Sequence, residues 1–308
     1  QVNLTVETLQ RGFERCNQEN QHVRAVIVQH SLGHPAEIAE IKHWCDKRKL
    51  ILIEDLAQGF GATASDGDKP KPLGSFADTI ILSFGRDKVI DAVSGGAVIF
   101  REPSSPLPTL SSPPTPAVLK DLAYPFWTWL IRATYSIGLG KIIHKMLTIM
   151  GLMTNPTASP TTQATALPAS LAKLALSQLQ NFNQAHQHRQ KIAALYLKNL
   201  SETPLQLITQ TTDLDRASLL RLAATTDNPQ SLLNFLKHHQ IHLTDRWYRS
   251  PVDCGKLNCA TNYQSGSCPR AKQLANTIIN LPTHQKISIA DAQKIIDLIK
   301  KYFEKQKK

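Results

Sequence analysis

The sequence predicts an α/β fold, with a mainly parallel sheet covered by helices on both faces and a smaller C-terminal α+β domain. Short runs of Ile, Leu and Val without polar alternation occur at 24–29, 50–54 and 79–82, as in strands buried within a parallel sheet. An apolar pattern of helical spacing follows later, at 169–200. With 308 residues, 42% of them hydrophobic, the chain can bury more core than one small domain needs.

Polar side chains follow these predicted strands at their carboxyl ends. His30 follows the first run, Asp55 and Gln58 follow the second, and Ser83 and Lys88 follow the third. Ligands of parallel sheets bind beyond the carboxyl ends of the strands, so we expect these residues to face one crevice. A lysine can hold an aldehyde as an imine, and an aspartate can keep a pyridine nitrogen protonated. The pair Asp55 and Lys88 therefore suggests a pyridoxal phosphate site.

Each of these residues also has a plainer interpretation when it is taken alone. An aspartate after a buried strand is often a helix cap, and a single loop lysine is usually solvated. A histidine at a strand end, such as His30, is often only hydrogen-bonded in place. The cofactor interpretation rests on the combination of residues.

At these positions the chain resembles the DegT/DnrJ/EryC1/StrS family of sugar aminotransferases, which have the fold of the aspartate aminotransferase superfamily. The matching segments are VIVQHSLGHPAEI, LILIEDLAQGFGA, LSFGRDKVIDAVSGGAVIF and CPRAKQLANTIINLPTH. Their order and spacing are those of the family, and they span most of the chain from Arg24 onward.

The resemblance implies a role for each matching residue. Lys88 would be the Schiff-base lysine, which also moves a proton between cofactor and substrate. Asp55 would pair with the pyridinium nitrogen, and Gln58 would lie close to the 3-oxygen of the ring. Ser83 would donate to the phosphate, and His30 would complete the cofactor-binding set.

Gly95 and Gly96, which come after the lysine, would permit close packing of the backbone beside its loop.

The activity implied by the resemblance is transfer of an amino group from an amino acid, such as glutamate, to a nucleotide-linked keto-sugar. The pathway would be surface polysaccharide or amino-sugar biosynthesis, and the enzyme would be a homodimer. Sugar dehydratases of the family usually have histidine at the lysine position, so Lys88 favours amino transfer. The alternative from another class is a non-catalytic binding protein that kept the fold.

The chain departs from the family pattern at its start and before its long helix. It opens at Gln1, without the first strands and the small-residue loop that binds phosphate in the family, so we expect a fragment. The sequence ALPAS at 166–170 replaces the family's stretch with asparagine and arginine, which lends a phosphate contact to the neighbouring subunit.

The third departure is the segment 102–162, which divides the chain into a cofactor domain at 1–101 and a second part at 163–308. We interpret the segment as a proline-rich linker, a hydrophobic helical unit at 119–153 and a Thr/Pro/Ala linker. It is too charged to predict a transmembrane helix. Its helices could cover the active-site mouth or pack in a dimer. Alternatively, its aromatic and basic residues could make a peripheral membrane contact.

Further elements are predicted in the second part. The pattern at 169–200 indicates a long helix or a kinked pair, and the runs at 205–208 and 218–224 indicate strands. The sequence DNPQ at 227–230 indicates a helix start, and SIAD at 288–291 begins the last helix with a capping-box pattern. We expect an inward stripe on that helix, made of Ile289, Ala292, Ile296, Ile299 and Phe303.

The net charge of +11 favours anionic partners, including nucleotide sugars and acidic lipids. The densest basic run is in the C-terminal tail, so we do not expect nucleic-acid binding. Five cysteines and no secretion signal indicate reduced thiols and a cytoplasmic location. Cys254, Cys259 and Cys268 cluster without a C-x-x-C pair, so we do not expect a metal site.

Overall fold

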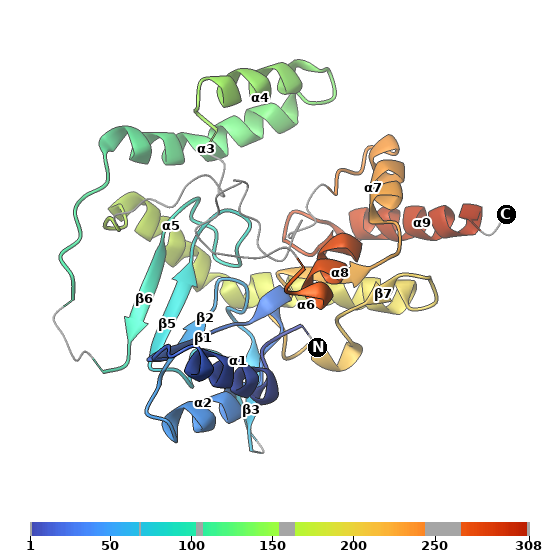
Figure 1. The fold of residues 1–308 in the computed structure, drawn as a ribbon. Helices are drawn as coiled ribbons and strands as arrows, with labels where there is room; N and C mark the ends of the chain where they lie inside the picture. The colour runs from blue at the N-terminus through green and yellow to red at the C-terminus, as the bar shows by residue number, and fades with distance from the viewer. Residues whose placement is uncertain (1, 68, 103–106, 154–163, 244–265, 307–308) are drawn as a thin grey trace.

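The structure is a computed structural model that describes residues 2–67, 69–102, 107–153, 164–243 and 266–306 (Figure 1). Its first sheet contains β1 (Ala25–Gln29), β2 (Ile51–Asp55), β5 (Thr79–Ser83) and β6 (Gly96–Phe100), in the spatial order β1-β2-β5-β6. Strands β1, β2 and β5 are parallel, and β6 runs antiparallel to β5. The predicted strands and their parallel order are therefore confirmed.

Helices α1 (Val6–Gln18) and α2 (Ile38–Asp46) lie on one side of this sheet (Figure 1). Ile38, Ile41 and Trp44 of α2 belong to the same buried cluster as Val28 and Leu52 of the strands. Ile27 and Ile51, which point to the other face because side chains alternate along a strand, are exposed. On this second face Ile53 and Ile81 are half-buried, so within the described residues its cover is partial.

Short elements connect the strands of this first part. A 3-10 turn, η1 (Ser31–Gly33), follows β1. Strands β3 (Thr63–Asp66) and β4 (Lys69–Pro72) form an antiparallel hairpin beyond β2.

The predicted helical unit between the two parts is a helical hairpin. It consists of α3 (Thr115–Ala133) and α4 (Leu139–Ile149), and Figure 1 shows it standing off from the sheet. Gly138 precedes α4 with φ at +82°, and a Cβ on Gly140 would lie 2.2 Å from the carbonyl oxygen of Ile131. Glycine therefore lets the two helices approach closely. The predicted Thr/Pro/Ala linker falls almost wholly on 154–163, outside the described residues.

The second part opens with two consecutive helices. Helix α5 (Ala169–Gln180) is separated from α6 (Phe182–Leu200) by Asn181, which confirms a kinked pair over a single long helix. A sheet of antiparallel pairs follows, in the order β7-β8-β9, with β7 (Gln206–Leu207), β8 (Arg221–Thr225) and β9 (Ile278–Pro282). The strand predicted at 218–224 is thus displaced toward the C-terminus. A turn, η2 (Thr211–Asp213), lies between β7 and β8.

Helices α7 (Pro229–His238), α8 (Pro269–Thr277) and α9 (Ile289–Gln306) complete this part. As predicted, Asn228 caps α7, and its side chain accepts a hydrogen bond from the Ser231 N–H. At the start of α9 the predicted capping interaction is present, since the Asp291 N–H donates to Ser288 Oγ and the Ser288 N–H donates back to the Asp291 carboxylate.

The core of the second part forms where α6, α7 and α9 pack on the small sheet. Tyr196, Leu222, Leu236 and Ile279 are buried there. Ala292, Ile296 and Ile299 of the predicted α9 stripe are also buried, and Phe303 is partly buried against them. Ile289 is exposed, so its prediction was wrong: as the first residue of α9, it precedes the turns that pack.

The two parts meet close to the carboxyl ends of β1 and β2. Leu32 of η1 is buried with Ala223 and Ile278 of the small sheet. No helix within the described ranges is both long and apolar enough to cross a bilayer.

Candidate active site

Asp55 is the last residue of β2, and its carboxylate is held by two donors. The Ala57 N–H donates to Oδ1 at 2.9 Å, and Nε2 of Gln29 donates to Oδ2 at 3.1 Å. Gln29 and Asp55 are partners in the parallel register of β1 and β2. Sequence reasoning missed Gln29, although its position opposite Asp55 in neighbouring strands would have indicated it. The carboxylate therefore has a fixed orientation at the sheet edge.

Lys88 lies in the loop that joins β5 to β6, and this loop is closed at its base. The Phe84 N–H donates to the Gly95 carbonyl and the Ala92 N–H donates to the Phe84 carbonyl, both at 2.9 Å. Lys88 is half-buried, and its own N–H donates to the Gly85 carbonyl at 3.2 Å. Strand β5 lies next to β2, so the loop begins at the same sheet edge as Asp55.

Ser83 stands at the start of this loop. Its hydroxyl oxygen accepts a hydrogen bond from the Gly85 N–H at 3.4 Å, which places it at the end of β5 before the chain turns toward Lys88. The end of the loop needs glycine. Gly95 has φ at +94°, and a Cβ there would lie 2.4 Å from Leu167 Cδ1. A Cβ on Gly96 would lie 2.4 Å from the Leu82 carbonyl oxygen, so the predicted close packing is confirmed.

His30 is fully buried, and both of its ring nitrogens have partners inside the protein. The Ala36 N–H donates to Nδ1 at 3.1 Å, so the proton lies on Nε2, which donates to Glu54 Oε1 at 3.2 Å. The Glu54 carboxylate, also fully buried, accepts from the N–H groups of Gly74 and Ala77. The structure thus places His30 beneath the sheet edge, in the hydrogen-bonded position that was its plainer interpretation.

Gln58 is 4% exposed and lies where the two parts of the chain meet. Its Oε1 accepts a hydrogen bond from the Leu32 N–H at 2.7 Å. Its main-chain carbonyl accepts from the Ser218 hydroxyl, and the Ser218 N–H donates to the Gly33 carbonyl. Gln58 therefore ties the end of β2 both to the turn after β1 and to the second part.

The second part also brings positive charge to the lysine loop. Arg221, at the start of β8, forms an ion pair of 3.7 Å with Asp87, the neighbour of Lys88. Arg189 of α6 is buried, and its guanidinium donates to the Leu220 carbonyl at 3.0 Å. Burial, and then the charge of Arg221, lower the pKa of Arg189 to about 10.

Burial and the same cations lower the pKa of His284. Although part of its surface is exposed, desolvation first and then Arg189 and Arg221 lower its pKa to about 4. Arg132 of α3 and Lys286 act in the same direction. The electrostatics of this region therefore favour anions, as phosphate or carboxylate groups of a ligand would be.

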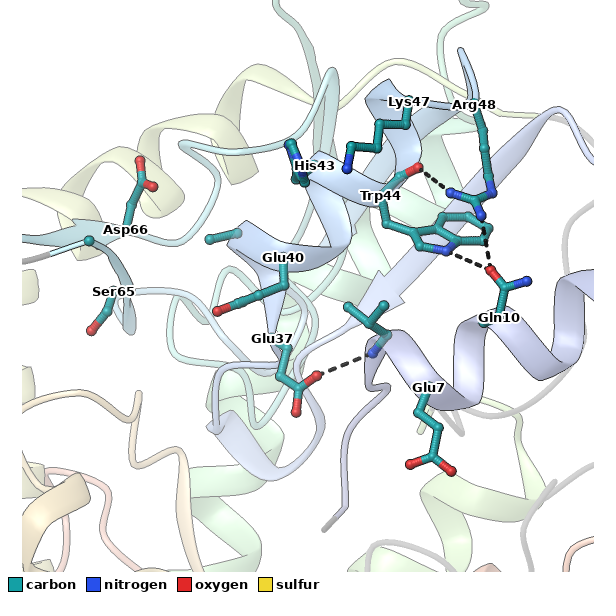
Figure 2. Close-up of a pocket in the computed structure, with 13 residues that line it drawn as sticks. Glu7, Gln10, Glu37, Glu40, His43, Trp44, Lys47, Arg48, Ser65 and Asp66 are labelled. Atoms are coloured by element: carbon teal, nitrogen blue, oxygen red, sulfur yellow. Dashed lines mark hydrogen bonds between the residues drawn. The ribbon is translucent and has the colours of Figure 1, made fainter.

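A groove of about 1110 Å³ lies elsewhere, among α1, α2 and β3 (Figure 2). Figure 2 shows that its polar groups bond to one another, because Gln10 Oε1 accepts from Trp44 Nε1 at 2.9 Å and from Arg48 at 3.1 Å. None of the predicted cofactor residues lines this groove.

In the described part of the chain, no group of three or more His, Cys, Asp or Glu residues could hold a metal ion. Of the clustered cysteines, Cys254 and Cys259 lie outside the described residues, and Cys268 is exposed.

Comparisons with a family model, with curated proteins and with solved structures all point to the same family. The model of the DegT/DnrJ/EryC1/StrS aminotransferase family matches residues 3–106 and 158–300. GDP-perosamine synthase of Vibrio cholerae is 35% identical over 94 residues, which are 30% of this chain and 24% of that protein. The dTDP-3-amino-3,4,6-trideoxy-alpha-D-glucose transaminase of Streptomyces venezuelae is 22% identical over 92% of this chain and 64% of its own length. The chain thus spans less than two thirds of these curated relatives.

Among solved structures, a DegT DnrJ EryC1 StrS aminotransferase from Brucella abortus has the same fold, with a TM-score of 0.68 at 19% identity. The likeness covers 98% of this chain and 70% of that structure.

Proposed function

Because the chain belongs to the DegT/DnrJ/EryC1/StrS aminotransferase family, we propose that it is a pyridoxal-phosphate-dependent aminotransferase. Its amino donor would be an amino acid such as glutamate, and its acceptor a nucleotide-linked keto-sugar. The observation that carries the proposal is the arrangement at the sheet edge. A fixed carboxylate on β2, that of Asp55, accompanies a half-buried lysine, Lys88, in the loop from the adjacent strand.

These residues fit the cofactor chemically. When bound, pyridoxal phosphate supplies an electron-withdrawing ring that stabilises a carbanion at the substrate carbon. Asp55 would face the ring nitrogen and keep it protonated, because its orientation is set by Gln29 and Ala57. Lys88 Nζ would hold the cofactor aldehyde and move the proton, and Ser83 would donate to the phosphate.

Gln58 and His30 would support the site in different ways. Gln58, tied to Leu32, would keep its place near the 3-oxygen of the ring. His30 would act through the sheet edge, because its ring bonds to Glu54 and to the Ala36 N–H and is fully buried.

The substrate class is supported by charge and by the relatives. Arg221 beside Asp87, with Arg189 behind it, gives the lysine loop cationic surroundings that suit the diphosphate of a nucleotide sugar. The two relatives are named for a GDP-linked and a dTDP-linked sugar. We further propose a homodimer in the cytoplasm that serves amino-sugar or surface polysaccharide biosynthesis. The proposed division is 1–101, 102–162 and 163–308.

The test is chemical labelling of the full-length protein with pyridoxal phosphate and borohydride, followed by peptide mapping. We expect the reduced cofactor on Lys88, and we expect no label at this loop in Lys88→Ala. A label on another lysine, or none, would show that the site is wrong. Labelling at Lys88 without amino transfer to GDP- or dTDP-linked keto-sugars would favour the non-catalytic binding protein.

A further inference from the structure

The helical hairpin of α3 and α4 lies between the two regions that the family model matches. The match stops at residue 106 and resumes at residue 158, so residues 107–157 are outside it. Since the proposed cofactor residues all lie within the matched regions, the exposed surface of the hairpin calls for a separate physical explanation.

Each helix of the hairpin carries an exposed apolar stripe. On α3 the stripe is Leu119, Leu122, Phe126 and Trp129, whose exposure runs from 44% to 63%. On α4 it is Leu139, Ile142, Met146 and Ile149, exposed by 46% to 76%. In both helices the spacing is three, four and three residues, which places the four side chains on one face.

These stripes are not the core of the hairpin. That core lies on other faces of the helices, where Ile131, Gly140 and Leu147 are buried. The outward side chains therefore leave two exposed apolar stripes in water, and exposed apolar patches of several large side chains usually mark an interaction site.

The inward face of α3 is occupied by the lysine loop. The Tyr124 ring lies 4.0 Å from the Arg86 guanidinium, and the Ser94 hydroxyl donates to the Asp121 carboxylate at 2.5 Å. One face of α3 thus contacts this loop at two points. The side chains of the two stripes stay exposed.

The net charge of the hairpin decides between two partners for the striped faces, a second copy of the chain and an anionic lipid surface. From 107 to 153 the basic residues are Lys120, Arg132, Lys141 and Lys145, against the single acid Asp121, a net charge of 4 − 1 = +3. A second copy would bring the same excess of positive charge to the contact. An anionic lipid surface would instead attract the cations, accept the aliphatic side chains and favour Trp129 at the interface.

We propose that the outer face of the α3–α4 hairpin binds peripherally to an anionic bilayer. The two stripes enter the boundary between headgroups and acyl chains, while Lys141 and Lys145 meet the headgroups. This holds the lysine loop beside the membrane, and it is independent of the amino transfer proposed above.

The test is flotation of the full-length protein with vesicles of phosphatidylcholine alone and of phosphatidylcholine mixed with phosphatidylglycerol. We expect binding to the anionic vesicles that weakens as salt is added, since salt screens charges near the surface. Trp129→Glu and Ile142→Glu should each weaken binding about tenfold or more, because each removes a large apolar group from the lipid. The matched control is Leu176→Glu on α5, which changes a leucine 55% exposed outside the hairpin and should bind as the parent does.

Three results would overturn the proposal. The first is equal flotation of the parent and both stripe variants. The second is equal binding to neutral and anionic vesicles. The third is absence of flotation, together with a concentration-dependent dimer that Trp129→Glu abolishes, which would identify a second copy as the occupant. Circular dichroism and labelling of Lys88 confirm that each variant is folded, and a failure of labelling in the parent leaves the flotation result unaffected.

Discussion

At the scale of single residues, the alternation of side chains along the strands decides which polar groups are structural. His30 continues the buried side of β1 after Val26 and Val28, and Glu54 continues the buried side of β2 after Leu52. Asp55 points to the opposite side. Neighbouring carboxylates thus have different surroundings: Glu54 bonds inside the core, while Asp55 stands at the sheet edge, where we propose that it meets a ligand. The residue types suggested one candidate site, and only this parity distinguishes the buried His30 from Asp55.

Replacing Asp55 with Asn should impair amino transfer with little effect on folding. The change removes the charge proposed to face the ring nitrogen, and we expect a loss of roughly 2–5 kcal/mol in transition-state stabilisation. Asn keeps an oxygen for the Ala57 N–H, so the free energy of unfolding should change by less than about 1.5 kcal/mol. Steady-state kinetics and denaturant unfolding measure the two effects.

The matched control is Glu54→Gln, the same change one residue earlier. Here the N–H groups of Gly74 and Ala77 and His30 Nε2 all donate to the carboxylate, and an amide nitrogen cannot accept from any of them. We expect a loss of about 1–3 kcal/mol in unfolding free energy. Near-normal transfer by Asp55→Asn would mean that another group holds the ring.

At the scale of elements, sequence patterns predicted the helices that have apolar spacing, and they missed a hairpin and a contact that have no apolar pattern. The apolar spacing at 169–200 and 119–153 gave helices that the structure contains. The hairpin of β3 and β4 was missed because Lys69–Pro72 alternates lysine with proline and has no apolar side chain to signal a strand. The attachment of α3 to the lysine loop was also hidden, since Tyr124 and Arg86 are far apart in the chain.

That attachment can be tested by removing it. Changing both Tyr124 and Asp121 to Ala deletes the ring over Arg86 and the acceptor of the Ser94 hydroxyl. The two contacts contribute together about 2 kcal/mol or more. We therefore expect amide hydrogen exchange of α3 to quicken roughly thirtyfold, because local opening sets that rate. The amides of β9 are the internal control, and unchanged exchange in α3 would show that other contacts hold the hairpin.

At the scale of the whole molecule, the contacts between the first and the second part of the chain could not be predicted from the sequence. Arg221 reaches Asp87, and Ser218 reaches the carbonyl of Gln58, across sequence separations of 134 and 160 residues. No periodicity in either segment specifies the other. The buried contact of Leu32 with Ala223 and Ile278 fixes this meeting, and with it the cations around the lysine loop.

This meeting also makes stability depend on pH through three histidines with lowered pKa, of which His34 and His186 are half-buried and His284 is exposed. His34 Nε2 lies 2.9 Å from the Thr209 hydroxyl across the junction, and burial lowers its pKa. Burial and then Arg189 lower the pKa of His186, and the pKa of His284 falls to about 4. Because each binds its proton less readily when folded, the unfolded chain takes up more protons as pH falls below about 6.5. Stability should therefore decrease as the pH falls from about 7 to about 5, before most carboxylates are protonated.

Thermal unfolding across this range should show the decline. His34→Gln, which keeps an amide to bond Thr209 but cannot titrate, should make it shallower; an acid slope as steep as that of the parent would mean that His34 is not a source of the dependence.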